Sequence, residues 1–523
     1  MTEESTGPIS TSDKTFFGHP RGLATLFFTE LWERFSYYGL RALLILFMTA
    51  PLLQKNAGLG FSTRKASAIY GLYTAAVYLL TIAGGWIADN LWGHRRTVFI
   101  GGCIIALGHF TMASPLVGIP TLPSFYAGLV CIVLGTGLLK PNVSTMVGSL
   151  YPKATKEEME RGENTDWGAR RDAGFSIFYM GINIGAILGP TICSYLGEDY
   201  NYHWGFSIAG FGMLLGLIAY SIGSHYLGPP GKFLPDISSR ELRLRNVKFY
   251  GTLGLSAVIC AIFAYITISG MVPLGLDAFT KYLGYLILAV TVFYFTYLLT
   301  LGGYDADQNK KLFAIFWLFL LSIVFWGGFN QAGSSMNLFA KHLTNRHLGF
   351  LGGWVMPAGW LQDINPLFIV LLAPVFGWLW TWLAHRNANP SIPVKFSLGL
   401  LGLAAGFFVI SWGAAYASRA HTVTPAWLVV TYFFHTVGEL CLSPVGLSSI
   451  TKLAPEDRVG QMMGIWFVGT GLGNLFSGLV AGTMQSLSPH TLFLEVAIFS
   501  AGVGVFALIL APLVNKYLMG DVT

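Results

Sequence analysis

Charged side chains are scarce in this sequence of 523 residues. Asp, Glu, Lys and Arg make up 11% of it, whereas a soluble domain typically carries about 25%. Hydrophobic residues make up 54%, aromatic residues 15%, and the mean hydropathy is +0.59. Apolar stretches of about 20 residues, long enough to cross a bilayer, alternate with short polar connections. The composition therefore excludes a soluble globular protein and predicts an all-α polytopic membrane protein.

Cysteine is also scarce, and several chemical motifs are missing. The five cysteines fall within apolar stretches without paired spacing or a zinc pattern, so we expect no disulfide and no metal. The absence of H-E-x-x-H, a paired catalytic Asp motif and a nucleophile elbow argues against a membrane-embedded enzyme. Residues 1–21 lack the pattern of a cleaved signal peptide and are expected to form a cytoplasmic tail. The net charge of +6 is spread over membrane-flanking loops, so no nucleic-acid partner is expected.

Fourteen membrane spans are predicted from the apolar stretches, and an even number places both termini on one side. Lys and Arg are about three times as frequent in the loops on the N-terminal side as in the opposite loops, so the positive-inside rule predicts an N-in, C-in topology. The predicted spans lie near 22–50, 66–90, 96–115, 123–150, 171–195, 204–226, 248–270, 280–302, 311–340, 361–384, 396–416, 426–452, 459–484 and 490–516.

The spans divide into six, two and six. The predicted domains are a cytoplasmic tail (1–21), an N-terminal six-helix bundle (22–226), a linker with two extra transmembrane helices (227–310) and a C-terminal six-helix bundle (311–523). The two extra spans carry almost no polar residues and are expected to face lipid. Both bundles contain intramembrane charges, and a substrate site between two bundles is the geometry of an alternating-access transporter. A channel is the less favoured alternative, which saturable, gradient-driven flux would exclude.

The first apolar segment, TELWERFSYYGLRALLILFM, carries polar residues at spacings of three, four and one, which place them on one helical stripe. They are Glu30, Glu33, Arg34, Tyr37, Tyr38 and Arg41. A charge at the centre of a membrane helix costs roughly 2.5 to 3.5 kcal/mol even on lenient insertion scales. The stripe is therefore expected to line a polar interior, where its charges pair with one another or meet a charged substrate or ion. Snorkelling at a helix end is the alternative, and it suits Arg21 better.

Several motifs resemble those of known families. GGWIADNLWGHRRT (84–97) resembles the signature loop of the major facilitator superfamily, although an ordinary positive-inside loop is the alternative. ELWERFSYYG (30–39) resembles the E-x-x-E-R-F-x-Y-Y-G motif of the proton-dependent oligopeptide transporter family, and FYMGINIG (178–185) resembles its F-Y-x-x-I-N-x-G signature. GTGLLKPNVSTMVGSLY (135–151) and GELCLSPVGLSSITKLAP (438–455) resemble its spans four and ten. The resemblance runs from about residue 20 to 515 and implies a major facilitator fold with the two extra helices of prokaryotic members.

The resemblance implies a short peptide as substrate, whose side chains vary while its charged termini do not. A promiscuous site is then expected to hold the termini by opposite charges and leave the middle to adaptable pockets. Apart from Arg41, Arg34 and Lys140 are the deep cations suited to the peptide carboxylate. Glu439, the deep carboxylate of the second bundle, suits the ammonium group.

Neutral and aromatic residues complete the expected substrate site. By resemblance, Asn183 and Asn365 help to bind the amino end and the backbone of the peptide, with an interhelical hydrogen bond as the alternative for either side chain. Aromatic residues that resemble cavity-lining positions of the family, with core packing as the alternative for each, are Tyr37, Tyr38, Tyr78, Trp326 and Trp466.

Proton coupling needs a carboxylate that changes its charge state when a neighbouring cation changes partner. Glu30 and Glu33 lie within one turn of Arg34 and suit that role, with Lys140 as a second cation. If a peptide carboxylate engages the cation, the glutamate loses its partner and takes up a proton, so the proton gradient would drive uptake.

Gating residues are also implied by the resemblance. Asp89, Arg95 and Arg96 belong to the loop that helps to latch the cytoplasmic side in the superfamily. Many family members carry an acid before the Gln of span seven that pairs with an arginine matching Arg41, but this chain has Asn330. Asn can hydrogen-bond to Arg41 but cannot neutralise it, which puts that part of the gate and the proton stoichiometry in question.

The sequence thus predicts a proton-coupled importer of di- and tripeptides in the bacterial inner membrane. It is expected to need no cofactor beyond the proton gradient, to interact with peptides, protons and the lipid bilayer, and to function as a monomer without an obligate protein partner. A transporter of the same fold for nitrate or a modified amino acid is the alternative.

Overall fold

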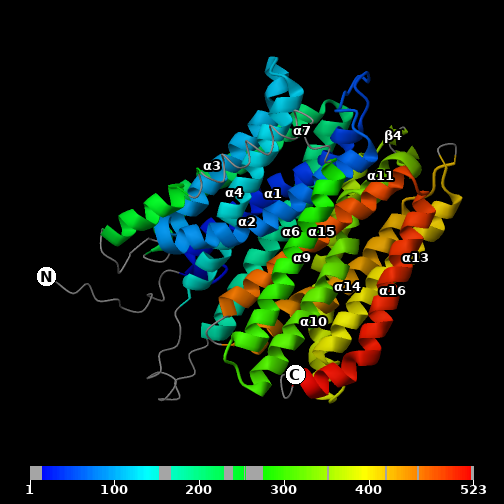
Figure 1. Ribbon diagram of the computed structural model, residues 1–523. Coiled ribbons are helices and arrows are strands. Elements are labelled where there is room, and N and C mark those ends of the chain that lie inside the picture. The colour runs from blue at the N-terminus through cyan, green and yellow to red at the C-terminus, as the bar shows by residue number, and fades with distance from the viewer. Residues whose placement is uncertain are drawn as a thin grey trace. The chain divides into compact units, whose positions relative to one another are not determined.

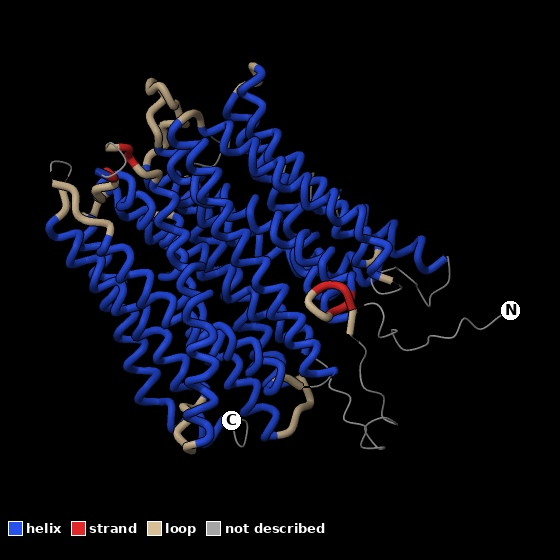
Figure 2. The backbone as a smooth tube through the Cα atoms, turned by 180° about the vertical axis from the view of Figure 1, so that it is seen from behind, coloured by secondary structure: helices blue, strands red, loops and turns tan. Residues whose placement is uncertain are grey.

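The computed structural model describes residues 14–151, 167–228, 240–251, 254, 275–349, 353–418, 421–455 and 459–519. Helices dominate these ranges, and strands occur there only as two short antiparallel pairs (Figures 1 and 2). The strand pairs are β1 (Lys14–Phe16) with β2 (His19–Pro20), and β3 (His347–Leu348) with β4 (Trp354–Val355). The long helices are α1 (Arg21–Thr49), α2 (Thr63–Ile87), α3 (His94–Ala113), α4 (Thr121–Ser149), α6 (Trp167–Asp199), α7 (Tyr202–Gly223), α9 (Leu276–Leu301), α10 (Ala306–Phe329), α12 (Ile364–His385), α13 (Ile392–Tyr416), α14 (Ala426–Leu453), α15 (Val459–Gly482) and α16 (Pro489–Val514).

Twelve helical segments in the described ranges are long and apolar enough to cross a membrane. They coincide with twelve of the predicted spans. The span predicted at 22–50 is α1, a continuous helix of 29 residues that carries five charged residues and is not among these twelve. Most of the span predicted at 248–270 lies outside the described residues. The all-helical membrane architecture is therefore confirmed, whereas the total of fourteen spans and the N-in, C-in orientation stay predictions.

The span predicted as one segment at 311–340 is interrupted. Helix α10 ends at Phe329, a 3₁₀ turn follows at Asn330–Gly333, and α11 (Ser335–Leu343) then begins. The Gln331 side chain stabilises the turn, because its Nε2 donates to the Ser477 carbonyl at 3.1 Å and its Oε1 accepts from Ser335 Oγ at 2.5 Å. Side-chain hydrogen bonds across helices satisfy the backbone and amide groups that such an interruption exposes.

The chain forms two compact units. The first comprises 1–38, 80–189 and 206–264, and the second comprises 39–79, 190–205 and 265–523. Helices α1, α2, α6 and α7 thus each contribute one part to each unit. Within the second unit, Asn337 Nδ2 donates to the Ala42 carbonyl at 2.8 Å and Asn474 Nδ2 to the Thr74 carbonyl at 3.1 Å. These contacts join residues 39–79 to the later helices of the same unit. The predicted domain boundaries at 21/22, 226/227 and 310/311 stay a prediction.

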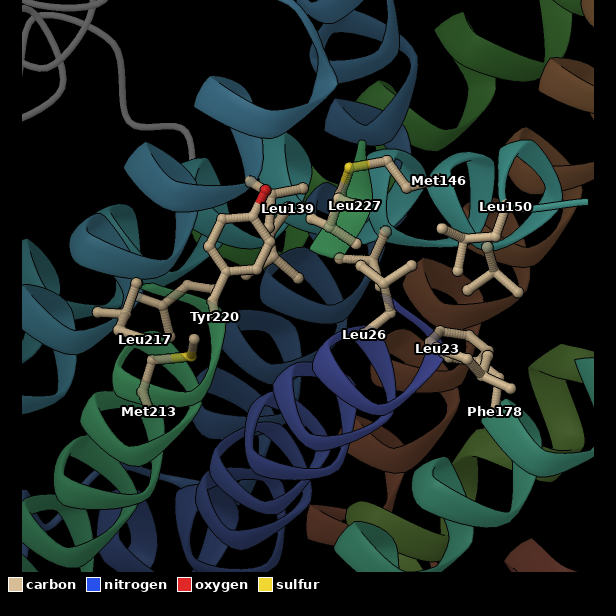
Figure 3. Packing of buried hydrophobic residues seen from close by; sticks show 14 of the residues in the cluster. Leu23, Leu26, Leu139, Met146, Leu150, Phe178, Met213, Leu217, Tyr220 and Leu227 are labelled. Atoms are coloured by element: carbon tan, nitrogen blue, oxygen red, sulfur yellow. The ribbon is translucent and has the colours of Figure 1, made fainter. Parts of the chain in front are cut away.

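Close helix packing in the first unit depends on glycine. Helix α3 lies against α4 at Gly101 and Gly135, where a Cβ on Gly135 would come within 2.6 Å of the Gly101 carbonyl oxygen. Small residues allow this approach, which drives helix association where lipid removes the hydrophobic contrast. An apolar cluster from α1, α3, α4, α6 and α7 fills the neighbouring space, with Leu26, Leu139 and Met213 completely buried (Figure 3). This packing fixes the helices that carry the buried charged residues.

Candidate functional site

Three charged residues of α1 form a compact buried cluster. Arg34 Nε lies 3.0 Å from Glu30 Oε1 and 2.5 Å from Glu33 Oε2. The three side chains are at most 5% exposed. The Arg34 guanidinium also lies 5.2 Å from the ring centroid of Tyr37, within cation–π range. The predicted pairing of charges along the α1 stripe is therefore confirmed for Glu30, Glu33 and Arg34.

Lys140 brings a second cation to this cluster from α4. It interacts electrostatically with Glu30, Glu33 and Arg34. Its helix is held close to α2, because a Cβ on Gly137 would lie 2.7 Å from the Leu80 Cβ. Two cations and two carboxylates thus lie within electrostatic range of one another, three of them buried and Lys140 half-buried. In such surroundings one proton or one added anion changes the balance of charge.

The FYMGINIG segment of α6 packs directly on α1 beside the cluster. A Cβ on Gly185 would lie 2.2 Å from the Leu31 carbonyl oxygen and 2.9 Å from the Arg34 Cβ. Gly181 makes a similar close approach to Phe27. Asn183 is buried between these glycines and donates from Nδ2 to the Tyr179 carbonyl of its own helix at 2.9 Å. The glycines therefore position α1, and Asn183 lies on the same buried part of α6.

A separate polar group lies in the second unit. Asn365, at the start of α12, donates from Nδ2 to Glu439 Oε2 at 3.1 Å and to Thr436 Oγ1 at 2.9 Å. Glu439 and Thr436 are on α14, one turn apart. The amide therefore orients the carboxylate without neutralising it. Glu439 also interacts electrostatically with Arg41. This arrangement leaves a half-buried anion suited to an ammonium ligand.

Arg41 belongs to the second unit, although it lies on the α1 stripe. Its Nε donates to the Tyr70 hydroxyl at 2.9 Å, and its second guanidinium nitrogen donates to Asn330 Oδ1 at 3.4 Å. Asn330 thus makes the hydrogen bond to Arg41 that its side chain allows. Tyr70 was not predicted, because it lies on α2 and only tertiary packing brings it to Arg41. The predicted single stripe is thus divided, with Glu30 to Tyr38 in one unit and Arg41 in the other.

The aromatic candidates occupy different environments. Tyr37 is buried and Tyr38 half-buried, with their ring centroids 5.2 Å apart. Tyr78 and Trp326 are half-buried. Trp466 is 3% exposed and packs against Gly446, where a Cβ would lie 2.2 Å from its ring. Core packing, the alternative for each of these residues, fits Trp466 best, and contact of any of the five with substrate stays a prediction.

The basic turn between α2 and α3 has local partners. Asp89 Oδ1 lies 3.2 Å from His94 Nε2, and His94 Nδ1 lies 2.7 Å from Asn142 Oδ1. Arg95 donates to the Gly228 carbonyl at 3.1 Å and also to the Ser224 carbonyl. These contacts tie the turn to α4 and to the end of α7. His94, rather than an arginine, is the basic partner of Asp89 among the described contacts.

Two charged contacts were not predicted from the sequence. Glu198, at the end of α6, lies 2.6 Å from Lys341 Nζ and accepts from the Gly359 backbone N–H at 3.1 Å. Asp363 accepts from Thr191 Oγ1 at 2.7 Å, while its buried Oδ1 has no hydrogen-bond partner in the described part of the chain. Both contacts join residues more than 140 positions apart, so no local pattern marks them. The only sequence signal for Asp363 was its position two residues before Asn365.

The described structure is that of a multi-pass helical membrane protein with charged side chains buried between its helices. Such side chains mark ion and substrate pathways, as in the class of membrane transporters. The family model described as "POT family" matches residues 95–492. The chain belongs to the POT family, and it is a transporter rather than an enzyme.

Relatives support this membership over nearly the whole chain. Peptide transporter YePEPT of Yersinia enterocolitica subsp. palearctica serotype O:3 (strain YE-P4) is 40% identical over 481 residues, covering 90% of this chain and 89% of that protein. The di-/tripeptide transporter of Lactococcus lactis subsp. cremoris is 37% identical over 519 residues, covering 98% and 99%. A crystal structure of peptide transporter POT in complex with sulfate superposes with a TM-score of 0.85 at 36% identity, covering 98% of this chain and all of that one. The resemblance inferred from the motifs is confirmed.

Proposed function

We propose that this protein is a proton-coupled symporter that imports di- and tripeptides by alternating access. The observation that carries the proposal is the buried cluster of Glu30, Glu33 and Arg34, with Lys140 in electrostatic range. Such a cluster is costly inside a membrane helix and is expected only where charge moves or a charged ligand binds. The names of the relatives, which are peptide and di-/tripeptide transporters, support a peptide as that ligand.

Substrate binding is assigned by charge. The peptide carboxylate is held by Arg34 and Lys140, and the amino terminus by Glu439 and Asn183. The hydrogen bond from Asn365 to Glu439 supports this assignment, because it orients the carboxylate while leaving its charge for the ammonium group. Tyr37, Tyr38, Tyr78, Trp326 and Trp466 are the aromatic candidates for side-chain pockets, with Trp466 the most deeply packed of them.

Proton coupling is assigned to the α1 cluster. Arg34 pairs with both carboxylates, so a peptide carboxylate that draws Arg34 or Lys140 away leaves one glutamate without its cation. That glutamate then takes up a proton, because a buried carboxylate is stable in the charged form only beside a positive charge. Release of the peptide restores the ion pair and expels the proton. Two carboxylates beside one arginine titrate as a set, so the proton belongs to the pair.

Gating and orientation complete the proposal. Arg41 with Asn330 helps to close the extracellular side, and Asp89, Arg95 and Arg96 help to latch the cytoplasmic side. The protein lies in the bacterial inner membrane with fourteen spans and both termini in the cytoplasm, and it functions as a monomer without a cofactor. The hydrogen bond that Arg41 donates to Asn330 Oδ1, in the 3₁₀ turn after Phe329, supports the assignment of these two residues to the extracellular gate.

A transporter of the same fold for nitrate or an amino-acid derivative is the competing function, and ligand-dependent thermal unfolding separates the two. A ligand that binds only the folded protein stabilises it by about 2.7 kcal/mol at a hundred times its Kd. We expect dialanine and trialanine to raise the Tm of the purified protein and nitrate to leave it unchanged. A shift with nitrate and none with either peptide would contradict a peptide site.

A further inference from the structure

A cavity of about 390 Å³ lies between three helices of the second unit, and neither Glu439 nor Arg41 lines it. Its lining comes from the middle and second half of α12, the start of α13 and the second half of α14. Its lining includes Trp380, Asn389, Ile392, Lys395, Ser449 and Lys452. None of these residues belongs to the proposed peptide site, the proton-coupling cluster or the gates.

The cavity contains two cations and no acid among its described lining residues. Lys395 is only 9% exposed, and its Nζ lies 4.6 Å from the ring centroid of Trp380. Lys452 is close enough to Lys395 for the two like charges to repel. Within the described residues neither lysine forms an ion pair. A buried cation is costly without a counter-charge, so this pair of lysines favours an anion as occupant.

The start of α13 adds a second positive feature. Ile392, the first residue of this 25-residue helix, lines the cavity, and the side chain of the N-cap residue Ser391 makes no capping hydrogen bond. The first N–H groups of a helix lack intrahelical partners, and the helix dipole places partial positive charge there. In α13 the Ile392 and Val394 N–H groups supply these donors, because Pro393 has none. A phosphate group is the anion best suited to a helix N-terminus with lysines beside it.

The rest of the lining indicates which phosphate-bearing molecule fits. Phe376 of α12 and Leu440 and Val445 of α14 line the cavity with apolar side chains. This apolar part of the lining suits acyl chains, whereas Lys395 and Lys452 suit a headgroup. Basic pockets at the cytoplasmic ends of transmembrane helices commonly bind anionic lipid headgroups.

We propose that the cavity bounded by Lys395, Lys452 and the start of α13 is a binding site for a phosphate-bearing anion, supplied by an anionic phospholipid. The same chemistry is available from free phosphate, which lacks acyl chains and therefore gains nothing from the apolar part of the lining. The site is independent of the peptide site, because none of its residues contributes to the groups around Arg34 or Glu439.

The test is thermal unfolding of the full-length protein in detergent, titrated separately with phosphatidylglycerol, phosphatidylcholine and inorganic phosphate. The variants are Lys395→Gln, Lys452→Gln and their combination, with Lys310→Gln, an exposed lysine at the start of α10, as the matched control. We expect phosphatidylglycerol to raise the Tm of the wild type more than phosphatidylcholine does. Each pocket substitution should lower the affinity for phosphatidylglycerol by about fivefold, the effect of one basic residue near an anionic headgroup. Lys310→Gln should leave that affinity unchanged.

The ligand-dependent shift, rather than the starting Tm, is compared between variants. Lys452→Gln lies at an exposed position and keeps the test valid if Lys395→Gln folds poorly. If inorganic phosphate raises the Tm, phosphatidylglycerol does not, and both pocket variants lose the phosphate effect, the anion site is supported and free phosphate is its occupant. Equal protection of wild type and double variant by phosphatidylglycerol, together with no effect of phosphate, would overturn the proposal.

Discussion

Asn365 donates a hydrogen bond from Nδ2 to Oε2 of Glu439 at 3.1 Å, and the same nitrogen also donates to Thr436 Oγ1 at 2.9 Å. The amide thus holds one oxygen of the carboxylate and adds no charge. A carboxylate that is oriented but not neutralised can bind an ammonium group strongly, because charge-assisted hydrogen bonds are roughly twice as strong as neutral ones.

Glu439→Gln keeps this geometry and removes the charge, so it tests the assignment to the peptide amino terminus. We expect dialanine to bind about ten- to hundredfold more weakly, corresponding to about 1.5–3 kcal/mol for a hydrogen bond to a charged group. N-acetylated dialanine has no ammonium group and should lose far less. Titration of both ligands against wild type and variant measures the difference. Equal losses would show that Glu439 has another role.

Lys140→Ala is expected to abolish gradient-driven uptake while the protein still folds. The substitution removes one of two cations that interact with Glu30 and Glu33, and it leaves Arg34 paired with both carboxylates. Folding should survive because one buried charge is removed while the ion pairs remain. Uptake by proteoliposomes is compared at equal protein content, with Lys310→Ala as control. Wild-type uptake by Lys140→Ala would contradict the assignment.

Gly185→Ala should destabilise the protein by about 1–3 kcal/mol, the usual cost of overpacking a close contact. Its Cβ would come within 2.2 Å of the Leu31 carbonyl oxygen and would move α1 at Arg34. Gly85→Ala is the matched control, since nothing lies within 4 Å of its Cβ and alanine favours a helix. Thermal unfolding of both variants gives the comparison. A Gly185→Ala variant as stable as Gly85→Ala would mean that α6 does not hold α1 in place.

Glu33→Gln separates proton coupling from peptide binding. A permanently uncharged residue 33 should allow counterflow, in which labelled and unlabelled peptide exchange at equal concentrations without net proton movement. Proton-driven accumulation should be lost. If Glu33 serves only to pair with Arg34, both activities should fall together, because a buried arginine without its partner is strongly destabilising. Glu30 shares the coupled pair, so Glu30→Gln/Glu33→Gln is measured beside the single variant.

The sequence was sufficient for the helices and for the family, because both depend on local information. Hydrophobic length predicted α1 within one residue at each end, and the spacing of Glu30, Glu33 and Arg34 predicted their pairing. The family motifs also paired the positions of Asn330 and Arg41, which are hydrogen-bonded in the structure. The first two features lie within a single helix, where periodicity and spacing determine the neighbours, and the third depends on the motif resemblance.

Tertiary partners could not be predicted in the same way. Tyr70 reaches Arg41 from another helix, and Glu198 reaches Lys341 across 143 positions. The 3₁₀ turn at Asn330–Gly333 depends on the Gln331 contact with Ser477, which hydropathy does not register. The division of α1 between two compact units depends on the packing of whole helices, which the spacing of residues within one helix does not register.

Uptake of labelled dialanine into proteoliposomes, with and without an imposed inward proton gradient, tests the central claim most directly. Wild-type protein is expected to accumulate dialanine above its external concentration only when the gradient is present, and Glu30→Gln/Glu33→Gln is expected only to equilibrate it. Accumulation by the double variant would show that the α1 cluster is not the proton path. Dialanine levels that do not respond to the gradient in the wild type would contradict proton-coupled peptide transport itself.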